Sequence, residues 1–132
     1  MKKAILLVFI FCSFIAFAQV EPIDTDANGY RNISTLDHLR WISECDSCIG
    51  WNLELDNDID ASDTRNWNIG DHDNNPSTPD SAMGWWPIGK DLMGYYGIFD
   101  GHGYKIYNLY INRPKQNHIG FFGDSFDMDK PS

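Results

Sequence analysis

The chain has 132 residues and a formal net charge of −9, and its acidic side chains are sixteen Asp and three Glu. A surface this negative repels phosphate backbones, so nucleic acid is not expected as a partner. Asp, Asn and Gly favour turns and are poor helix formers, so the composition predicts a mainly β protein with long loops. The length suits one domain with a modest core.

The first 18 residues have the pattern of a cleavable secretory signal peptide. Lys2 and Lys3 precede an apolar run over residues 4–17, which ends at the small-x-small sequence Ala16-Phe17-Ala18. This run of about 14 residues is shorter than the roughly 20 that span a bilayer. Cleavage there leaves an exported chain that begins at Gln19 and carries a formal charge of −11, because two lysines are lost. We therefore expect a secreted or cell-surface protein without a transmembrane segment.

Export leaves two cysteines, in the sequence Cys45-Asp46-Ser47-Cys48. In an oxidising compartment such a pair can close a local disulfide, which is the expected outcome. Free thiols and a metal or redox site remain as alternatives. The redox alternative lacks the βαβ context of a thioredoxin-like motif, and a zinc site would need two further ligands.

The first predicted element is a short helix, which follows a polar, aperiodic linker at residues 19–32. Leu36, Leu39 and Ile42 are spaced to form one apolar stripe, with Asp37 in the first turn, where the helix dipole favours negative charge. The helix should end near Cys45. We expect its stripe to cap the strands that follow.

Short strands are predicted after the helix. From Trp51 the hydrophobic period changes to two, which is typical of a strand with one buried face, and residues 58–60 continue it. Residues 61–83 are rich in Asp, Asn, Ser, Thr and Pro, as in a long acidic surface loop. Further short apolar runs, separated by glycines, lie at residues 85–86, 98–99, 105–111 and 119–122. Residues 124–132 form a polar tail.

Four segments of the chain resemble, in the same order, the opening of bacterial surface proteins that carry the GLUG motif. The longest is G-I-F-D-G-H-G-Y-K-I-Y-N-L-Y-I at residues 97–111, and the others are D-I-D at 58–60, W-W-P-I-G at 85–89 and G-F-F-G at 120–123. Phe121 stands where the family often has Leu. The chain stops nine residues after Gly123, before any repeat array, as a truncated reading frame or a fragment would.

The resemblance implies a mainly β fold over residues 33–123, in which an N-terminal capping helix precedes a few rungs of a right-handed parallel β-helix. It also implies an adhesin-like protein at the surface of a bacterium. In this setting Asp100-Gly101-His102-Gly103 is interpreted as a sharp corner between strands, with His102 as a solvated turn residue. A polar tail would leave the last rung poorly covered, so self-association through the C-terminal end is expected.

A calcium site is predicted in the acidic loop, with oxygen ligands from Asp71, Asp73, Asn75 and Asp80. Alternating Asp and Asn oxygens suit a hard cation. Pro76, however, stands where an EF-hand loop needs glycine, so the site would be a weaker one of another kind. The alternative is a solvated loop that holds no ion. No other cofactor is expected.

The chain carries none of the common catalytic motifs, so it is predicted not to be an enzyme. We expect a binding or adhesion module whose partners are surface glycans or proteins, because Trp and Tyr rings can stack on sugars or anchor a partner. The alternative is the N-terminal, non-catalytic portion of a β-helical carbohydrate-active enzyme. The candidates for an aromatic surface patch are the tyrosines at positions 95, 96, 104, 107 and 110.

Overall fold

The computed structural model describes residues 20–90 and 94–124. The predicted signal peptide at residues 1–18 lies outside the described residues, and so does the predicted tail at residues 124–132 except for Asp124. Within the described part, the strands are short and mostly parallel, and there is one α-helix. The expectation of a mainly β protein is therefore met at this coarse level.

The predicted helix is present as α1, Leu36–Glu44. Thr35 caps its start, because the Thr35 side chain accepts a hydrogen bond from the His38 backbone N–H at 3.2 Å. Leu39 and Ile42 are 0% and 2% exposed, so the predicted stripe faces the core. The helix ends at Cys45, where a short 3-10 helix, η1 (Asp46–Cys48), begins.

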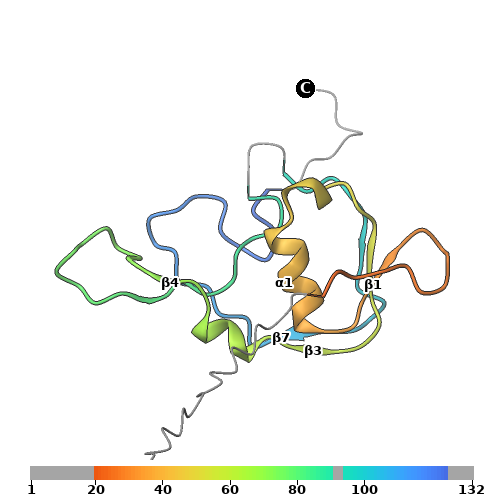
Figure 1. The fold of residues 1–132 in the computed structure, drawn as a ribbon, viewed down its shortest axis with the longest axis horizontal. Helices are drawn as coiled ribbons and strands as arrows, with labels where there is room; N and C mark the ends of the chain where they lie inside the picture. The colour runs from red at the N-terminus through yellow and green to blue at the C-terminus, as the bar shows by residue number, and fades with distance from the viewer. Residues whose placement is uncertain (1–19, 91–93, 125–132) are drawn as a thin grey trace, which may run out of the picture.

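Two parallel sheets are formed by strands that lie between residues 31 and 107. Strands β1 (Arg31–Ile33), β2 (Leu53–Leu55) and β6 (Phe99–Asp100) form the first, in that order, and β3 (Ile59–Asp60) pairs with β7 (Ile106–Tyr107) in the second. The chain thus passes through the first sheet and then the second, and later repeats this order one layer further along (Figure 1).

The predicted surface loop at residues 61–83 contains more structure than its composition suggested. It begins with a 3-10 helix, η2 (Ser62–Asn66), and continues into an antiparallel hairpin of β4 (Ile69–Gly70) and β5 (Ser81–Ala82). The hairpin extends away from α1 as an arm (Figure 1). Its strands are too short and too polar to give an alternating hydrophobic pattern, which is why the sequence did not indicate them.

The segment expected to be a linker, residues 19–32, is instead part of the fold over its described length. Pro22 is fully buried, the Ile23 carbonyl accepts a hydrogen bond from the Asn32 backbone N–H at 3.0 Å, and β1 already begins at Arg31. The segment therefore covers the outer edge of β1. Its polar side chains bond to polar groups of the first sheet, as Thr25 does to Asn32 and Asn28 does to Glu54. A polar composition therefore did not mean a linker.

The core lies between α1, the two parallel sheets and an aromatic cluster from the later part of the chain. Trp85 is fully buried, and its ring stacks on Phe121 at a centroid distance of 5.3 Å. Its indole N–H donates to the Phe121 carbonyl at 3.0 Å. The remaining buried members of this core include Ile33, Leu39, Ile42, Leu53, Leu55, Ile59, Ile88 and Tyr95.

Candidate functional site

Two neighbouring clefts lie beside the outer face of α1. The first has a volume of about 430 Å³ and the second about 270 Å³. Arg40 in the first cleft and Glu44 in the second are one helical turn apart and form an ion pair at 3.0 Å. Because Trp67 and Asn68 are also consecutive, the two clefts lie close together, and we call the two clefts together the helix groove. The groove is lined by Leu36, Asp37, Arg40, Glu44, Asp63, Asn66, Trp67, Asn68, Trp86 and Lys90.

Each tryptophan of the helix groove has a cation over its ring. The Arg40 guanidinium carbon lies 4.6 Å from the Trp67 ring centroid, and Trp67 stacks on Trp85 at 6.4 Å. The Trp86 ring has Arg113 at 4.0 Å and Lys90 at 5.3 Å. These contacts restrict the orientations that the two tryptophan rings can adopt.

Arg113 supports the groove from within the protein. It is 4% exposed, and it donates to the Trp85 carbonyl at 3.0 Å and to the Gln116 side chain at 3.2 Å. Desolvation lowers the pKa of Arg113 from its ordinary value. The side chain nevertheless stays charged at neutral pH, since arginine has so high an ordinary pKa.

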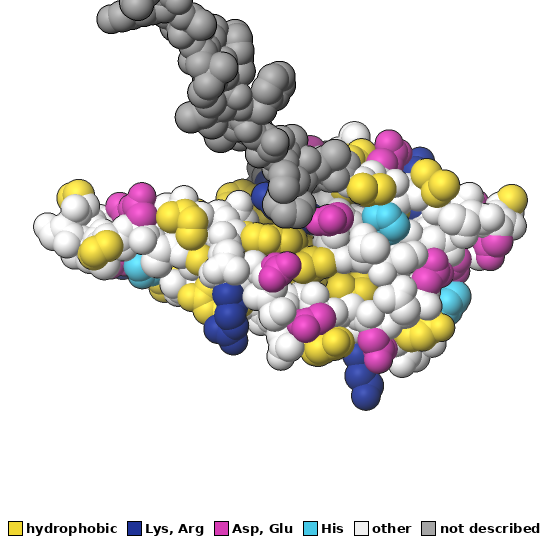
Figure 2. Space-filling model, turned by 60° about the horizontal axis from the view of Figure 1, so that its bottom comes forward, with side chains coloured by type: hydrophobic (Ala, Val, Ile, Leu, Met, Phe, Trp, Pro, Cys, Tyr) yellow, Lys and Arg dark blue, Asp and Glu magenta, His cyan; other side chains and the backbone are white. Residues whose placement is uncertain are grey.

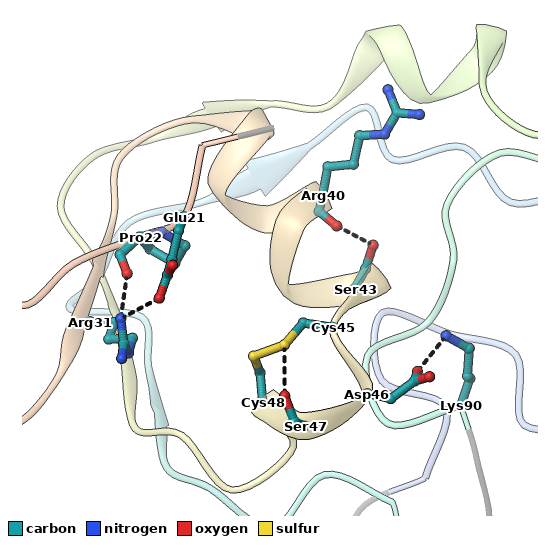
Figure 3. Close-up of a disulfide and its surroundings, with 10 residues drawn as sticks. All are labelled: Glu21, Pro22, Arg31, Arg40, Ser43, Cys45, Asp46, Ser47, Cys48 and Lys90. Carbon is teal, nitrogen blue, oxygen red and sulfur yellow. Dashed lines mark hydrogen bonds and ion pairs between the residues drawn. A yellow bond between two sulfur atoms is a disulfide. The ribbon is translucent and has the colours of Figure 1, made fainter. Parts of the chain in front are cut away.

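The charges along the helix groove are mixed. Asp37, Asp63 and Glu44 supply carboxylates, whereas Arg40 and Lys90 supply cations. The Lys90 ammonium is already paired with Asp46 at 3.0 Å (Figure 3). Because cations and Trp85 already lie against the faces of these rings, the lining offers a ligand mainly ring edges, carboxylates and amides, and the carboxylates and amides can accept hydrogen bonds from sugar hydroxyls. The arrangement therefore suits an uncharged, hydroxyl-rich ligand better than a phosphate or sulfate.

The two cysteines are joined by a disulfide, the first of the three outcomes weighed from the sequence (Figure 3). The Cys45 and Cys48 Cα atoms are 5.4 Å apart, within the usual range for a disulfide. Cys48 is 1% exposed and belongs to the core. The bridge therefore ties the end of α1 to the core.

The oxygens predicted to bind calcium mostly accept hydrogen bonds from their own loop. Asp71 Oδ1 accepts from the backbone N–H groups of Asp73 and Asn75, both at 3.2 Å. Asp73 Oδ1 accepts from the Asn75 N–H at 3.0 Å, and Asp80 lies at the far end of the loop, next to β5. Desolvation raises the pKa of Asp73. Hydrogen bonds, above all the one from the Asn75 N–H, outweigh that effect, so the pKa of Asp73 lies below its ordinary value.

A second loop repeats the same alternation of oxygens and was missed from the sequence. Asp24, Asp26 and Asn28 are followed by Gly29, which has φ of 90°. The Asp24 carboxylate accepts from the Gly29 N–H at 2.8 Å and from the Asn28 N–H at 3.2 Å. The Gly29 hydrogen bond is the largest influence lowering the pKa of Asp24. The signal was the spacing D-x-D-x-N-G, which lay within the segment assigned to a linker.

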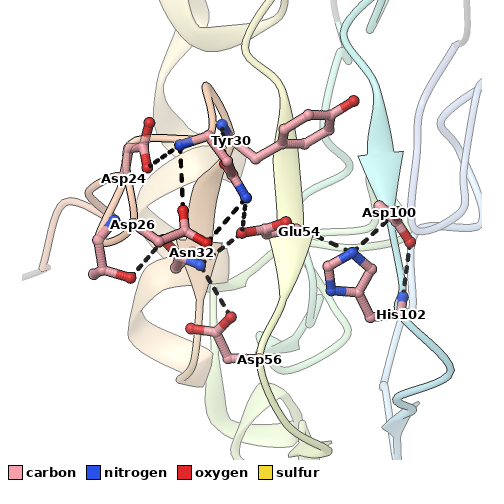
Figure 4. A network of polar contacts seen from close by, with 10 residues as sticks. Asp24, Asp26, Tyr30, Asn32, Glu54, Asp56, Asp100 and His102 are labelled. Carbon is pink, nitrogen blue, oxygen red and sulfur yellow. Dashed lines mark hydrogen bonds and ion pairs between the residues drawn. The ribbon is translucent and has the colours of Figure 1, made fainter.

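This second loop is one side of a polar network on the outer face of the first sheet (Figure 4). Glu54 of β2 is 4% exposed, although its place in the alternating pattern predicted exposure. Its Oε1 accepts from the side-chain amides of Asn32 at 2.7 Å and Asn28 at 3.0 Å. His102 lies on its other side, with Nε2 at 3.6 Å from Glu54 and 3.1 Å from Asp100.

The predicted tyrosine patch is divided by the structure. Tyr95 is 4% exposed and belongs to the core, where its hydroxyl donates to the Trp51 carbonyl at 2.7 Å. Its burial raises the pKa of the phenol. Tyr96, Tyr104 and Tyr107 are exposed, and Tyr110 is half-buried with Arg65 over its ring at 5.0 Å. Tyr95 therefore does not belong to a surface patch. The composition could not show that this tyrosine lies in the core.

Residues 20–90 and 94–124 hold no cluster of three or more His, Cys, Asp or Glu side chains placed to bind a metal ion. No helix in this part of the chain has the length and apolar character needed to cross a membrane.

The sequence is similar over a short stretch to a protein from Evansella cellulosilytica named "Putative Gly-rich membrane protein". The two are 45% identical over 40 residues, which is 30% of this chain and 5% of that protein. The chain thus spans a small fraction of this relative's length. No family model matches the chain, and no solved structure matches it.

Proposed function

We propose that the chain is an exported, non-catalytic binding or adhesion module that acts outside the cell or at the cell surface of a bacterium. The observation that carries this proposal is the helix groove, in which Trp67 and Trp86 stand beside carboxylates and amides. The acidic composition and the signal-peptide pattern support a place outside the cytoplasm. Surface glycans are the ligand class that this lining suits best.

We further infer that the described residues form the start of a right-handed parallel β-helix capped by α1. Support comes from register: Leu53 of β2 pairs with Phe99 of β6, and Ile59 of β3 pairs with Ile106 of β7. Two successive turns of a β-helix stack in this way. The buried residues of α1 belong to the same core cluster as those strands, as expected of a cap.

The binding proposal is tested with purified exported protein and uncharged oligosaccharides, such as β-1,4-linked hexamers of glucose and of N-acetylglucosamine. Binding to the helix groove should change the tryptophan fluorescence in a saturable way. Asp63 and Asn66 are exposed, so the double substitution Asp63→Ala/Asn66→Ala should leave the fold intact. It should weaken binding by at least about tenfold, since each lost polar contact in a binding site commonly costs about 1 kcal/mol or more.

The matched control is Asn117→Ala, which removes an exposed amide outside the helix groove and should bind as the unchanged protein does. Fluorescence that none of the oligosaccharides alters, or equal affinity in the double variant, would contradict the proposal. The alternative, the N-terminal, non-catalytic portion of a β-helical carbohydrate-active enzyme, would bind sugars without cleaving them. Sequencing the gene past the codon for Ser132 distinguishes the two: further G-L-F-G repeats would favour adhesion, whereas a clustered acidic and basic site would favour the enzyme.

A further inference from the structure

Strand β7 lies at the open edge of the second sheet. The Lys105 and Tyr107 carbonyls accept hydrogen bonds from the backbone N–H groups of Ile59 and Ala61, both at 2.8 Å. In a parallel ladder, alternate residues direct their N–H and C=O groups toward the neighbouring strand. Ile106 lies between Lys105 and Tyr107, so its N–H and C=O groups point away from β3. Within the described ranges β3 is the one strand that pairs with β7. The edge therefore offers one donor and one acceptor at Ile106.

The side chains along this edge alternate in character. Ile106 is half-buried against the core, whereas Lys105 is exposed and Tyr107 is 46% exposed. Tyr107 pairs in register with Asp60 of β3. The side of the molecule that carries β3 and β7 lies at the bottom of Figure 1 and is turned toward the viewer in Figure 2, where hydrophobic side chains are exposed among acidic ones.

We propose that this edge binds a second copy of the chain through antiparallel pairing of the two β7 strands about a two-fold axis at Ile106. The two Ile106 residues then exchange both of their backbone hydrogen bonds, as one type of antiparallel residue pair does. In this register Lys105 of each copy lies opposite Tyr107 of the other. The contact thus contains two equivalent cation–π pairs and brings the two half-buried isoleucines together.

The edge of β6 is less suited to the same role. The equivalent position there is Phe99, whose ring already packs edge-on against Phe121 and Phe122, each at 5.5 Å. A two-fold axis at Phe99 would place Ile98 opposite Asp100, an apolar side chain against a carboxylate. Complementarity across the axis therefore favours β7 over β6.

Net charge sets the salt dependence of this contact. Each exported copy carries a formal charge of −11, so two copies repel each other at long range. The cation–π pairs act at short range and are partly shielded from water. Association should therefore tighten as salt is raised and the repulsion is screened.

The test is sedimentation equilibrium of the exported protein over a wide range of protein and salt concentrations. A monomer–dimer equilibrium that strengthens with salt is expected. Tyr107→Lys places lysine opposite Lys105 at both positions and should weaken dimerisation by at least about tenfold. The exchange variant Lys105→Tyr/Tyr107→Lys restores the complementary pairs and should restore the dimer.

The control is Tyr96→Lys, a change of equal charge at a tyrosine that is 44% exposed elsewhere, and it should not alter the equilibrium. Circular dichroism checks folding, and the exchange variant keeps the test decisive if Tyr107→Lys alone misfolds. A protein that stays monomeric up to about 1 mM overturns the proposal. So does equal weakening by Tyr96→Lys, or dimerisation that appears only after residues 125–132 are deleted, which would identify the chain's own tail as the occupant of the edge.

Discussion

Glu54 is a buried carboxylate on the outer face of a strand, with two neutral amides at Oε1 and with His102 Nε2 3.6 Å from Oε2. Both Asn28 and Asn32 donate to the same oxygen, Oε1. Glutamine keeps an oxygen in that place, whereas leucine removes it and leaves the buried Asn32 amide with Asp56 as its remaining acceptor, at 3.0 Å. The identity of the acceptor atom, more than its charge, should therefore decide stability here.

We accordingly expect Glu54→Leu to lower the free energy of unfolding by about 1–3 kcal/mol, because it leaves buried donors without a full set of partners. Glu54→Gln should cost less than about 1 kcal/mol. Urea unfolding followed by tryptophan fluorescence measures both. Equal losses in the two variants would mean that the negative charge, and not the acceptor, holds this network together.

The calcium prediction also belongs to single residues. Millimolar Ca²⁺ should raise the melting temperature more than Mg²⁺ does, because an ion that binds only the folded state stabilises it. Asp71→Asn/Asp73→Asn should abolish that shift if the predicted site is correct. Asp24→Asn/Asp26→Asn alters the other D-x-D-x-N loop and is the matched control. A melting temperature that neither Ca²⁺ nor a chelator changes would mean that the loops are closed by their own hydrogen bonds.

At the scale of elements, the buried residues of α1 share one core cluster with the parallel strands. Leu39 is fully buried in the core that contains Leu53 and Leu55 of β2. Leu39→Asp should lower the free energy of unfolding by several kcal/mol, at least about 3, since it removes a core side chain and buries a charge. Leu36→Asp, at the half-buried end of the same stripe, should cost clearly less. A harmless Leu39→Asp in a thermal unfolding experiment would refute the role of α1 as a cap.

The Cys45–Cys48 disulfide closes a small loop at the end of that helix. A bridge with a sequence separation of 3 constrains the unfolded chain only modestly, so its loss should cost about 2 kcal/mol. Cys45→Ala/Cys48→Ala should show this loss in urea unfolding, and a reductant should lower the stability of the unchanged protein by a similar amount. A reductant that has no effect would show that the bridge does not contribute to stability.

For the molecule as a whole, the sequence predicts export with removal of residues 1–18. Protein collected from the culture medium or the cell surface should begin at Gln19, or within a residue or two of it. Intact-mass measurement and N-terminal sequencing determine this directly. Exported protein that retains Met1 would contradict the signal-peptide prediction, and Ala18→Arg, which spoils the small-residue pattern at the cleavage site, should block processing.

Local pattern was enough to predict several features of the protein. The helix from Leu36, its apolar stripe and the strand at Leu53 follow from periodicity, because a helix or a strand buries one face at a fixed spacing. A disulfide between Cys45 and Cys48 was the favoured outcome because an exported chain meets oxidising conditions, in which such a closely spaced pair can bond. Each of these features depends on residues close in sequence, which is why a single sequence carries them.

Only the tertiary structure decided which segments far apart in the chain lie together. Glu54 is buried because residues 24–30 and His102 cover the outer face of β2, and no local pattern records that cover. Arg40 and Trp67 line one cleft because η2 returns to the side of α1. Contacts of this kind arise where the chain folds back on itself. Their free energy depends on packing between segments that are far apart in sequence, and no local sequence pattern indicates which segments will meet.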